Sequence, residues 1–354
     1  MIRIRRGVAI EVERARPGVL SLLVEVDGTK ERALAYEALT GPVAPGDRVV
    51  LNTGAVALRL GTGGGHFVIA VEGGQDVDPP AHGGHAMKLR YTPGQHAVLP
   101  VEETHRELID GFDGLAGKPV VVASLHSALA PVCIASRTID PDARTAYVMT
   151  DAAALPIAFS ETVAALKEQG LLDSTITTGQ SFGGDLEAVN RFTGIIAAQV
   201  VAEARVIVVC QGPGNLGTAS RYGFAALEAG ETVNAAAALG GRPIVAPRLS
   251  FADPRQRHRG ISHHTLTALG VAALVGSEIA LPTLAPDRRE AIDRQLEEAH
   301  LLDLHRVVEV ELGDAVEDAL RSTPVPLRSM GRSFDDDPDY FRAAAAAAVL
   351  ALGS

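Results

Sequence analysis

Short apolar segments with the alternation of β-strands fill the first seventy residues of the chain. They lie between turns rich in Gly, Pro and Asp, and no amphipathic segment of helical length separates them. Five segments have this pattern: 2–13, 18–28, 31–39, 47–58 and 66–74. The pattern predicts a small antiparallel sheet or barrel. A Pro-, Gly- and His-rich loop at 76–87 follows, before one more strand pair within 88–101, so we expect a small all-β, barrel-like domain over 1–105.

From residue 106 to 354 the pattern changes to strands that alternate with helices. Strands are expected within 119–127, 145–151, 174–181, 205–214, 242–250, 278–284 and 305–312. Helices are expected within 160–170, 185–204, 220–230, 264–276 and 286–302, and in the Ala-rich run at 343–353. Such alternation is typical of an α/β fold, so the second domain is predicted to be a mainly parallel, open (doubly wound) sheet with helices on both faces.

Ligands of open parallel sheets bind beyond the carboxyl ends of the strands. The residues that follow the predicted strands are richer in Gly, His, Asp, Ser and Arg than the helices between them. They are His126 and Ser127, Thr150 and Asp151, Gly179–Asp185, Gln211–Thr218 and Ser250–His264. We therefore expect the functional site at this edge, with His126 and Ser181 lining the same cleft.

The segment from Ala252 to Thr265 is the densest chemical cluster in the chain. It contains Asp253, Arg255, Arg257, His258, Arg259, His263 and His264. Histidine is a common general acid or base, and a carboxylate fixes its tautomer, whereas arginines bind phosphate or carboxylate groups bidentately. The cluster indicates an anionic substrate, with proton transfer by His258 or His263 and with Asp253 as the orienting group. The adjacent His264 begins the next predicted helix, where it either faces the ligand or packs.

The sequence GQSFGG at 179–184 matches G-x-S-x-G, the nucleophile elbow of α/β-hydrolases. Ser181, Asp253 and His263 also follow one another in the order of that triad. Two observations count against a serine hydrolase: the preceding strand is polar, and chance matches are common in a chain with 36 glycines. Ser181 is otherwise a turn residue or a substrate contact.

A second motif, G-x-G-x-x-G, lies at Gly212, Gly214 and Gly217, directly after the apolar strand RVIVV and before a helix expected near Ser220. This context favours phosphate binding by backbone N–H groups. A dinucleotide site normally uses the first strand of its domain and an acidic residue after the next strand, but here the strand is about the fourth and the next one ends at Arg248. Another anionic group is therefore favoured, although an arginine at this place leaves NADP open. The residues expected to contact that group are Gly212, Gly214, Asn215, Gly217, Thr218, Arg255 and Arg257.

No metal site is predicted. The N-terminal histidines His66, His82, His85 and His96 have no H-E-x-x-H or similar spacing and are interpreted as polar loop residues. The glycine-rich segment 60–67 is interpreted as a hairpin turn, and the four aspartates within 335–339 as partners of the final helix.

Composition limits the classes of partner. A net charge of −11 disfavours general binding of nucleic acid or of a membrane surface, which depends on clustered Lys and Arg. Two cysteines are too few for a disulfide framework, and neither a signal peptide nor an apolar membrane span is recognised. We expect a cytoplasmic protein whose partner is a small anionic molecule, and a homo-oligomer is compatible with this composition.

Several segments together resemble an uncharacterised bacterial family known as a domain of unknown function. They are 46–70, 87–95, 179–190, 211–218 and 253–269, and the resemblance spans nearly the whole chain. It implies a bacterial cytoplasmic protein and assigns no catalytic residue. The leading hypothesis is an enzyme that acts on a small anionic molecule, phosphorylated or nucleotide-like, at the carboxyl edge of the sheet. The alternatives are a serine hydrolase and a non-catalytic protein that senses a metabolite or binds a partner.

Overall fold

The computed structural model describes residues 2–60, 64–74, 84–218 and 220–353. The chain divides into two compact units, Met1–Gly83 with Leu89–Ala97, and Gly84–Lys88 with Val98–Ser354. The predicted turn at 60–67 and the predicted loop at 76–87 include residues 61–63 and 76–83, which lie outside the described residues.

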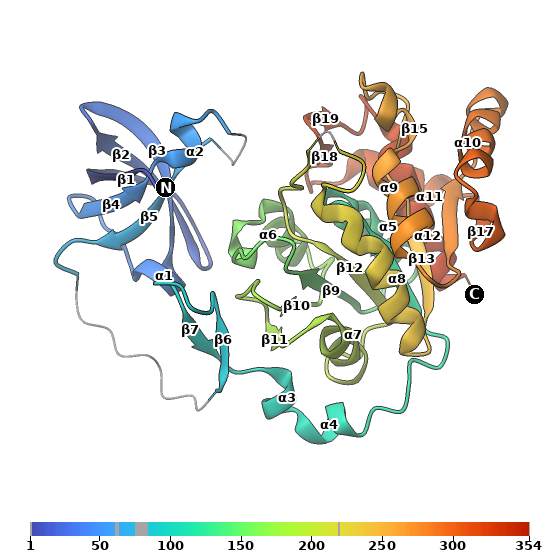
Figure 1. Ribbon diagram of the computed structural model, residues 1–354, viewed down its shortest axis with the longest axis horizontal. Helices are drawn as coiled ribbons and strands as arrows, with labels where there is room; N and C mark the ends of the chain where they lie inside the picture. Colours follow the sequence, from blue (N-terminus) through green and yellow to red (C-terminus); the bar gives the residue numbers. More distant parts are fainter. Residues whose placement is uncertain (1, 61–63, 75–83, 219, 354) are drawn as a thin grey trace. The chain divides into compact units, whose positions relative to one another are not determined.

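Five strands close into a barrel in the first unit (Figure 1). The strands are β1 (Ile4–Arg16), β2 (Val19–Val26), β3 (Thr29–Tyr36), β4 (Arg48–Asn52) and β5 (His66–Val71), and their order around the barrel is β1-β2-β3-β5-β4. Apolar side chains at alternate positions, such as Leu22 and Val24 on β2, fill the interior. The predicted barrel is confirmed, but β3 and β5 pair in parallel. Two predicted strand segments also end in short helices, α1 (Glu37–Thr40) and α2 (Gly54–Ala57).

The expected extra strand pair is present as β6 (Ala86–Lys88) and β7 (His96–Val98). Two short helices, α3 (Val101–Thr104) and α4 (Arg106–Asp110), then lead into the larger sheet.

Eight parallel strands form the sheet of the second unit, in the order β11-β10-β9-β12-β8-β13-β16-β17 (Figure 1). They are β8 (Pro119–Ala123), β9 (Thr145–Thr150), β10 (Ser174–Thr178), β11 (Leu186–Ala188), β12 (Val206–Gln211), β13 (Arg242–Ala246), β16 (Glu278–Pro282) and β17 (Arg306–Val310). The central strands are continuous apolar runs because helices cover both of their faces. The predicted α/β fold with a parallel sheet is therefore confirmed.

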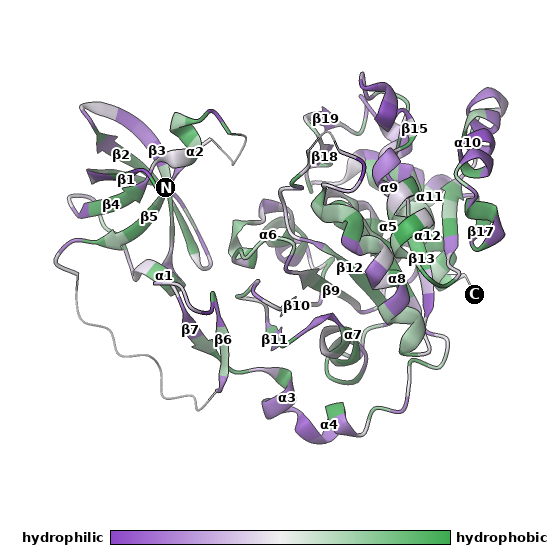
Figure 2. Cartoon of the chain, in the orientation of Figure 1, coloured by the Kyte–Doolittle hydropathy of each residue, from purple (hydrophilic) through white to green (hydrophobic). Residues whose placement is uncertain are grey.

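Helices pack on both faces of this sheet. They are α5 (Leu129–Ile139), α6 (Glu161–Glu168), α7 (Arg191–Val200), α8 (Glu228–Ala238), α9 (His263–Thr267), α10 (Pro286–Glu298), α11 (Asp314–Ser322) and α12 (Pro338–Leu352). A π-helical turn, Ala268–Ala272, extends α9. Figure 2 shows α10 as mostly hydrophilic, and its buried residues are Ile292 and Leu296. The Ala-rich α12 buries its run of alanines 343–348 against the sheet and α5.

Two predicted helices near the functional edge are placed wrongly. Residues 185–204 were expected to be one helix, but they form β11 followed by α7. Asn190 caps the start of α7, because its side chain accepts hydrogen bonds from the N–H groups of Phe192 and Thr193. The helix expected near Ser220 begins only at Glu228, after a single 3₁₀ turn at Ala225–Leu227.

Candidate functional site

A cavity of about 390 Å³ opens at the carboxyl edge of the sheet. It lies beyond the neighbouring strands β8 and β12. The connections that follow these two strands run to opposite sides of the sheet: β8 is followed by β9, next to β12, and β12 is followed by β13, next to β8. Such a reversal is the usual ligand position in open α/β sheets. The lining residues come from segments after β8, β12 and β13, from Thr162 and from the turn at 328–330.

Gly212 and Gly214 of the loop after β12 each have a structural reason. A Cβ at Gly212 would lie 3.0 Å from the Met149 sulfur, and Gly214 has φ +97°, a region that side chains disfavour. A Cβ at Gly217 would lie 3.8 Å from the His264 ring, so this backbone passes close to the histidine cluster. The spacing therefore reflects the shape of one loop, which lines the cavity.

The loop after β12 offers backbone donors, although no helix begins directly after it. Within the described residues, the N–H groups of Gly214, Asn215 and Gly217 donate no hydrogen bond to the protein. The Asn215 side chain accepts from Gln211 and from the Ala226 N–H, and its amide lies 3.4 Å from Nδ1 of His264. The loop is thus fixed to the histidines, while its own donors are available to a ligand.

The dense cluster of the sequence folds as the connection of a small hairpin. Strands β14 (Leu249–Ser250) and β15 (Gly260–Ile261) pair directly after β13, and the residues between them turn back over the sheet edge. Gln295 of α10 supports the hairpin, because its side-chain amide hydrogen-bonds the backbone of Arg259 and Ile261. This support positions Arg255, Arg257 and His258 on the cavity wall.

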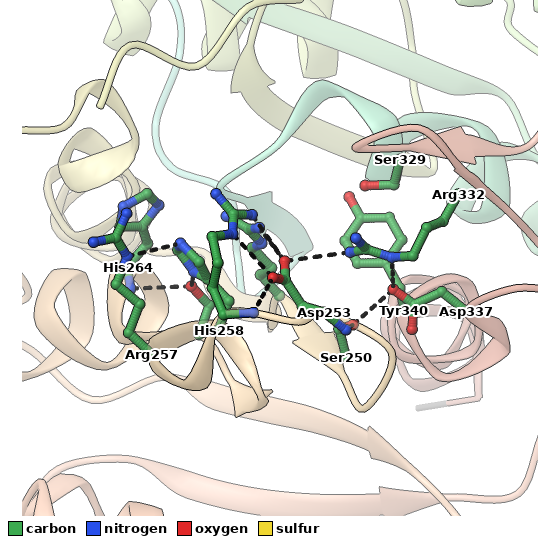
Figure 3. Close-up of polar contacts among 12 residues, drawn as sticks. Ser250, Asp253, Arg257, His258, His264, Ser329, Arg332, Asp337 and Tyr340 are labelled. Carbon is green, nitrogen blue, oxygen red and sulfur yellow. Dashed lines mark hydrogen bonds and ion pairs between the residues drawn. The ribbon is translucent and has the colours of Figure 1, made fainter. Parts of the chain in front are cut away.

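Asp253 lies at the centre of this connection, fully buried, and it binds arginines (Figure 3). Its carboxylate accepts from Arg255 at 2.8 Å, Arg248 at 3.2 Å and Arg332 at 3.4 Å. The Arg255 hydrogen bond holds the pKa of this carboxyl well below its usual range. The predicted role of Asp253 as the group that orients a catalytic histidine is therefore wrong, because the carboxylate instead fixes guanidinium groups.

Arg332 extends the same network away from the cavity. Its Nε donates to Asp337 at 2.9 Å, and Asp337 also accepts from the Ser250 hydroxyl at 2.7 Å (Figure 3). Asp337, one of the aspartates assigned to the final helix, thus ties α12 to the hairpin.

Three histidines of this region pack against one another. The ring centroids of His258, His263 and His264 are 4.3 to 5.0 Å apart, and Phe224 stacks on His264 at 4.0 Å. His258 and His264 line the cavity, whereas His263 lies behind them. Burial and the nearby arginines lower the pKa of His258 and of His264 to about 3, and the pKa of His263 is lowered for the same reasons. All three rings are therefore neutral at pH 7, which is the form that binds metal ions.

His126, after β8, also lines the cavity, but both of its ring nitrogens are already used. Nε2 lies 2.7 Å from the Ser160 hydroxyl, and Nδ1 lies 3.0 Å from the hydroxyl of Tyr147, which donates to the Gln211 carbonyl. Burial lowers the pKa of His126 to about 4. Its neighbour Ser127 bonds Ser329 and Tyr340. These contacts make His126 part of the wall, and its expected catalytic role has no ring nitrogen to support it.

Ser181 is placed away from this chemistry. Its hydroxyl is fully buried and donates to the carbonyls of Thr178 and Met149. The strand that follows G-x-S-x-G is β11, whereas a nucleophile elbow continues into a helix. The serine-hydrolase alternative and the predicted place of Ser181 in the cleft are both wrong.

The cavity unites all seven of the predicted ligand-contacting residues with further residues that were not in that set. Gly212, Gly214, Asn215, Gly217, Thr218, Arg255 and Arg257 all line it. The additional charged residues are Arg248 and Arg328, so four arginines and no carboxylate of the described residues face the cavity. Arg248 follows strand β13 closely, so the rule that ligands bind beyond the carboxyl ends of the strands (the edge rule) was sufficient to find it. Nothing in the sequence points from residues 328–330 to this site.

Two of these arginines lack a counter-ion. Within the described part of the chain, neither Arg257 nor Arg328 forms an ion pair, and Arg257 instead donates to Nε2 of His258 at 3.3 Å. A wall with unpaired guanidinium groups in a chain of net charge −11 is locally positive.

A search of the described residues for helices long and apolar enough to cross a membrane finds none. The model of a protein family matches residues 32–348, and its description is "Protein of unknown function (DUF3866)". The chain belongs to this family. No curated protein matches the chain.

Proposed function

We propose that this protein is an enzyme that binds a small molecule through a phosphate or similar anionic group in the cavity at the carboxyl edge of the sheet. The carrying observation is the charge of the wall: among the residues that the structure describes, four arginines and no carboxylate line the cavity. Bacterial cytoplasm is the proposed setting, as composition and the resemblance to bacterial proteins favour.

Three kinds of donor support binding of an anion. Arg257 and Arg328 line the cavity and form no ion pair with a carboxylate among the described residues. Arg255 is held at a fixed angle by two hydrogen bonds to Asp253. The N–H groups of the 212–218 loop add backbone donors of the kind that contact phosphate oxygens. Together these groups would surround an anion with charge-assisted hydrogen bonds, which are roughly twice as strong as neutral ones.

The neutral histidines favour an enzyme over a protein that only binds. A binding site for an anion needs cations and N–H donors, but His258 and His264 add neutral imidazoles to the same wall. Imidazoles that are uncharged at pH 7 bind metal ions, whereas a pKa of about 3 makes these two rings weak proton acceptors. Their position beside the arginines places this chemistry next to the proposed anion.

Isothermal titration with inorganic phosphate tests the binding. We expect one saturable site per chain, with affinity that falls as salt is raised. Arg257→Gln should weaken phosphate binding by about tenfold or more, since a hydrogen bond to a charged group contributes about 1.5–3 kcal/mol. The matched control is Arg294→Gln, because Arg294 lies on the exposed face of α10 in a surface pair; it should bind phosphate like the unmodified protein.

Turnover is followed separately, by ³¹P NMR of sugar phosphates and nucleotides incubated with the protein. Conversion of a compound that also competes with phosphate supports the enzyme. Competition without conversion favours the non-catalytic, metabolite-sensing alternative, and absence of saturable phosphate binding contradicts the whole proposal.

A further inference from the structure

The three histidines next to the cavity have the arrangement of a metal site. One nitrogen of each of His258, His263 and His264 lies within 4.8 Å of the others. Tetrahedral zinc, with Zn–N bonds near 2.0–2.1 Å, keeps imidazole nitrogens about 3.3 Å apart. The widest pair would therefore need to close by about 1.5 Å, a movement within the reach of side-chain torsions.

His263 supplies the observation that the protein fold does not explain. Its Nε2 is buried and finds no hydrogen-bond partner among the described residues. A buried polar atom without a partner costs free energy and is rare in folded proteins. His263 also does not line the cavity, so a ligand bound to the arginines alone would leave this nitrogen unsatisfied. An ion between the three rings would satisfy it.

The surroundings of the rings match those of metal-binding histidines. Arg257 donates to Nε2 of His258, so the proton of this imidazole is on Nδ1. That Nδ1–H donates to the Ser262 hydroxyl at 2.7 Å. Such a bond on the far nitrogen orients a ligand ring and fixes its tautomer. Ser262 also accepts from the His264 N–H at 3.2 Å, and Phe224 stacks on His264. Ser262 and Phe224 thus hold the rings without occupying the nitrogen of His258 that faces Arg257.

We propose that His258, His263 and His264 bind one divalent transition-metal ion, with Zn²⁺ as the best match to three imidazoles. Imidazole ligands suit Zn, Cu, Fe and Ni, whereas Ca²⁺ and Mg²⁺ prefer oxygen. Three protein ligands leave a coordination position open, as in catalytic rather than structural zinc sites. Because His258 and His264 line the cavity, that position would face it.

The arginines affect this site in two ways. Their positive charge opposes a bare cation, and Arg257 occupies Nε2 of His258 in the present arrangement. Arg257 is exposed and has no carboxylate that holds it, so its side chain can leave that nitrogen. An anion in the open position would offset the charge, and the metal and the arginines would then share it. The metal site extends the proposed function and shares His258 and His264 with it, but it does not use the arginines and does not require phosphate binding.

Titration of the chelator-treated protein with Co²⁺ alone tests the site. We expect one Co²⁺ per chain, with the visible d–d absorption of a tetrahedral or five-coordinate imidazole site, and displacement of that absorption by Zn²⁺. His263→Ala should abolish this absorption. His85→Ala is the matched control, because His85 is an exposed histidine of the same unit, and it should leave the absorption unchanged.

A second variant guards against misfolding. Ser262→Ala keeps all three ligands and removes the hydroxyl that orients His258, so metal affinity should fall about 10–100-fold while the d–d bands persist at saturation. In addition, Zn²⁺ should raise the Tm of the unmodified protein and not that of His263→Ala.

Weak, non-stoichiometric Co²⁺ binding that His263→Ala leaves unchanged would overturn the metal site. Phosphate binding by the metal-free protein is measured in a separate titration, so failure of the metal site and failure of the proposed anion site give different results.

Discussion

Two walls of the same cavity carry similar residues in different states. The wall after β8, residues 125–127, contains His126 and Ser127, whose side-chain polar atoms are all hydrogen-bonded to neighbours such as Tyr147 and Tyr340. The wall after β13, residues 248–264, contains arginines and histidines of which Arg257 has no counter-ion and His263 has a nitrogen without a partner in the described residues. We call them the β8 wall and the β13 wall.

The difference separates polar groups that are hydrogen-bonded within the protein from polar groups that remain available to a ligand. Buried polar groups in proteins are nearly always hydrogen-bonded, so a satisfied histidine indicates structure and an unsatisfied one indicates a missing partner. Burial lowers the pKa of His126 and of His258 alike, and the shifted values alone do not tell the two walls apart. The hydrogen bonds of these two rings are also alike, because each ring has a partner on both nitrogens. The walls differ instead in the unpartnered Nε2 of His263 and in Arg257, which forms no ion pair among the described residues.

The largest expected effect comes from the support beneath the β13 wall. Asp253→Asn removes the charge that holds Arg248, Arg255 and Arg332, and it leaves the buried guanidinium of Arg248 uncompensated, whereas Arg332 keeps Asp337. Breaking a buried ion pair from one side costs about 3–5 kcal/mol, so the free energy of unfolding in urea should fall by that amount.

Glu290→Gln is the control for the Asp253 substitution, because Glu290 pairs with Arg294 on an exposed helix face. Exposed pairs contribute about 0–1 kcal/mol. Equal losses in the two variants would show that Asp253 does not organise the arginines.

A smaller effect is expected from titration of the β8 wall. The pKa of His126 is about 4 in the fold, against about 6.5 in the unfolded chain, so between these values the unfolded chain binds more protons. Stability is therefore complete above pH 6.5 and falls as the pH drops toward 4. For one group the loss is about 3 kcal/mol.

His126→Gln isolates this contribution, because the other buried histidines titrate in both proteins. Unfolding free energies measured from pH 7 to 4 should fall less steeply in the variant. Parallel curves would mean that His126 is not held neutral by its burial and its hydrogen bonds.

The sequence predicted the architecture because its two hydrophobic periods are clear. The alternation in residues 2–74 is typical of strands with one buried face. Apolar strands such as RVIVV are typical of strands with two buried faces. Helix α5 was missed because its buried segment Leu129–Ser136 is apolar all round and contains a proline, so it lacks an amphipathic period. The start of α8 was misplaced because the Gly-rich segment before it resembles a βα turn.

The residues of the site were predicted from the sequence, but the hydrogen bonds and ion pairs between them were not. The edge rule brought the 212–218 loop and the 252–265 cluster together, as the cavity lining shows. It did not reveal that Asp253 binds arginines, because Asp253 is near both arginines and histidines in the sequence and only the folded hairpin turns it to Arg248 and Arg255. The third arginine, Arg332, is 79 positions away. The histidine group was also invisible as a metal motif, since the close packing of His258 with His263 and His264 depends on the β14–β15 hairpin.

The smallest expected effect separates binding from stability. Ser127 lies in the cavity lining, yet its hydroxyl bonds Tyr340 at 2.6 Å and Ser329 at 3.0 Å. Ser127→Ala should lower the free energy of unfolding by about 1 kcal/mol, the value of one typical hydrogen bond, and should leave phosphate affinity unchanged. Arg257→Gln should do the reverse, with weakened phosphate binding and stability near that of the unmodified protein. If Ser127→Ala weakens phosphate binding as strongly as Arg257→Gln, the β8 wall also serves the ligand and the distinction between the walls fails.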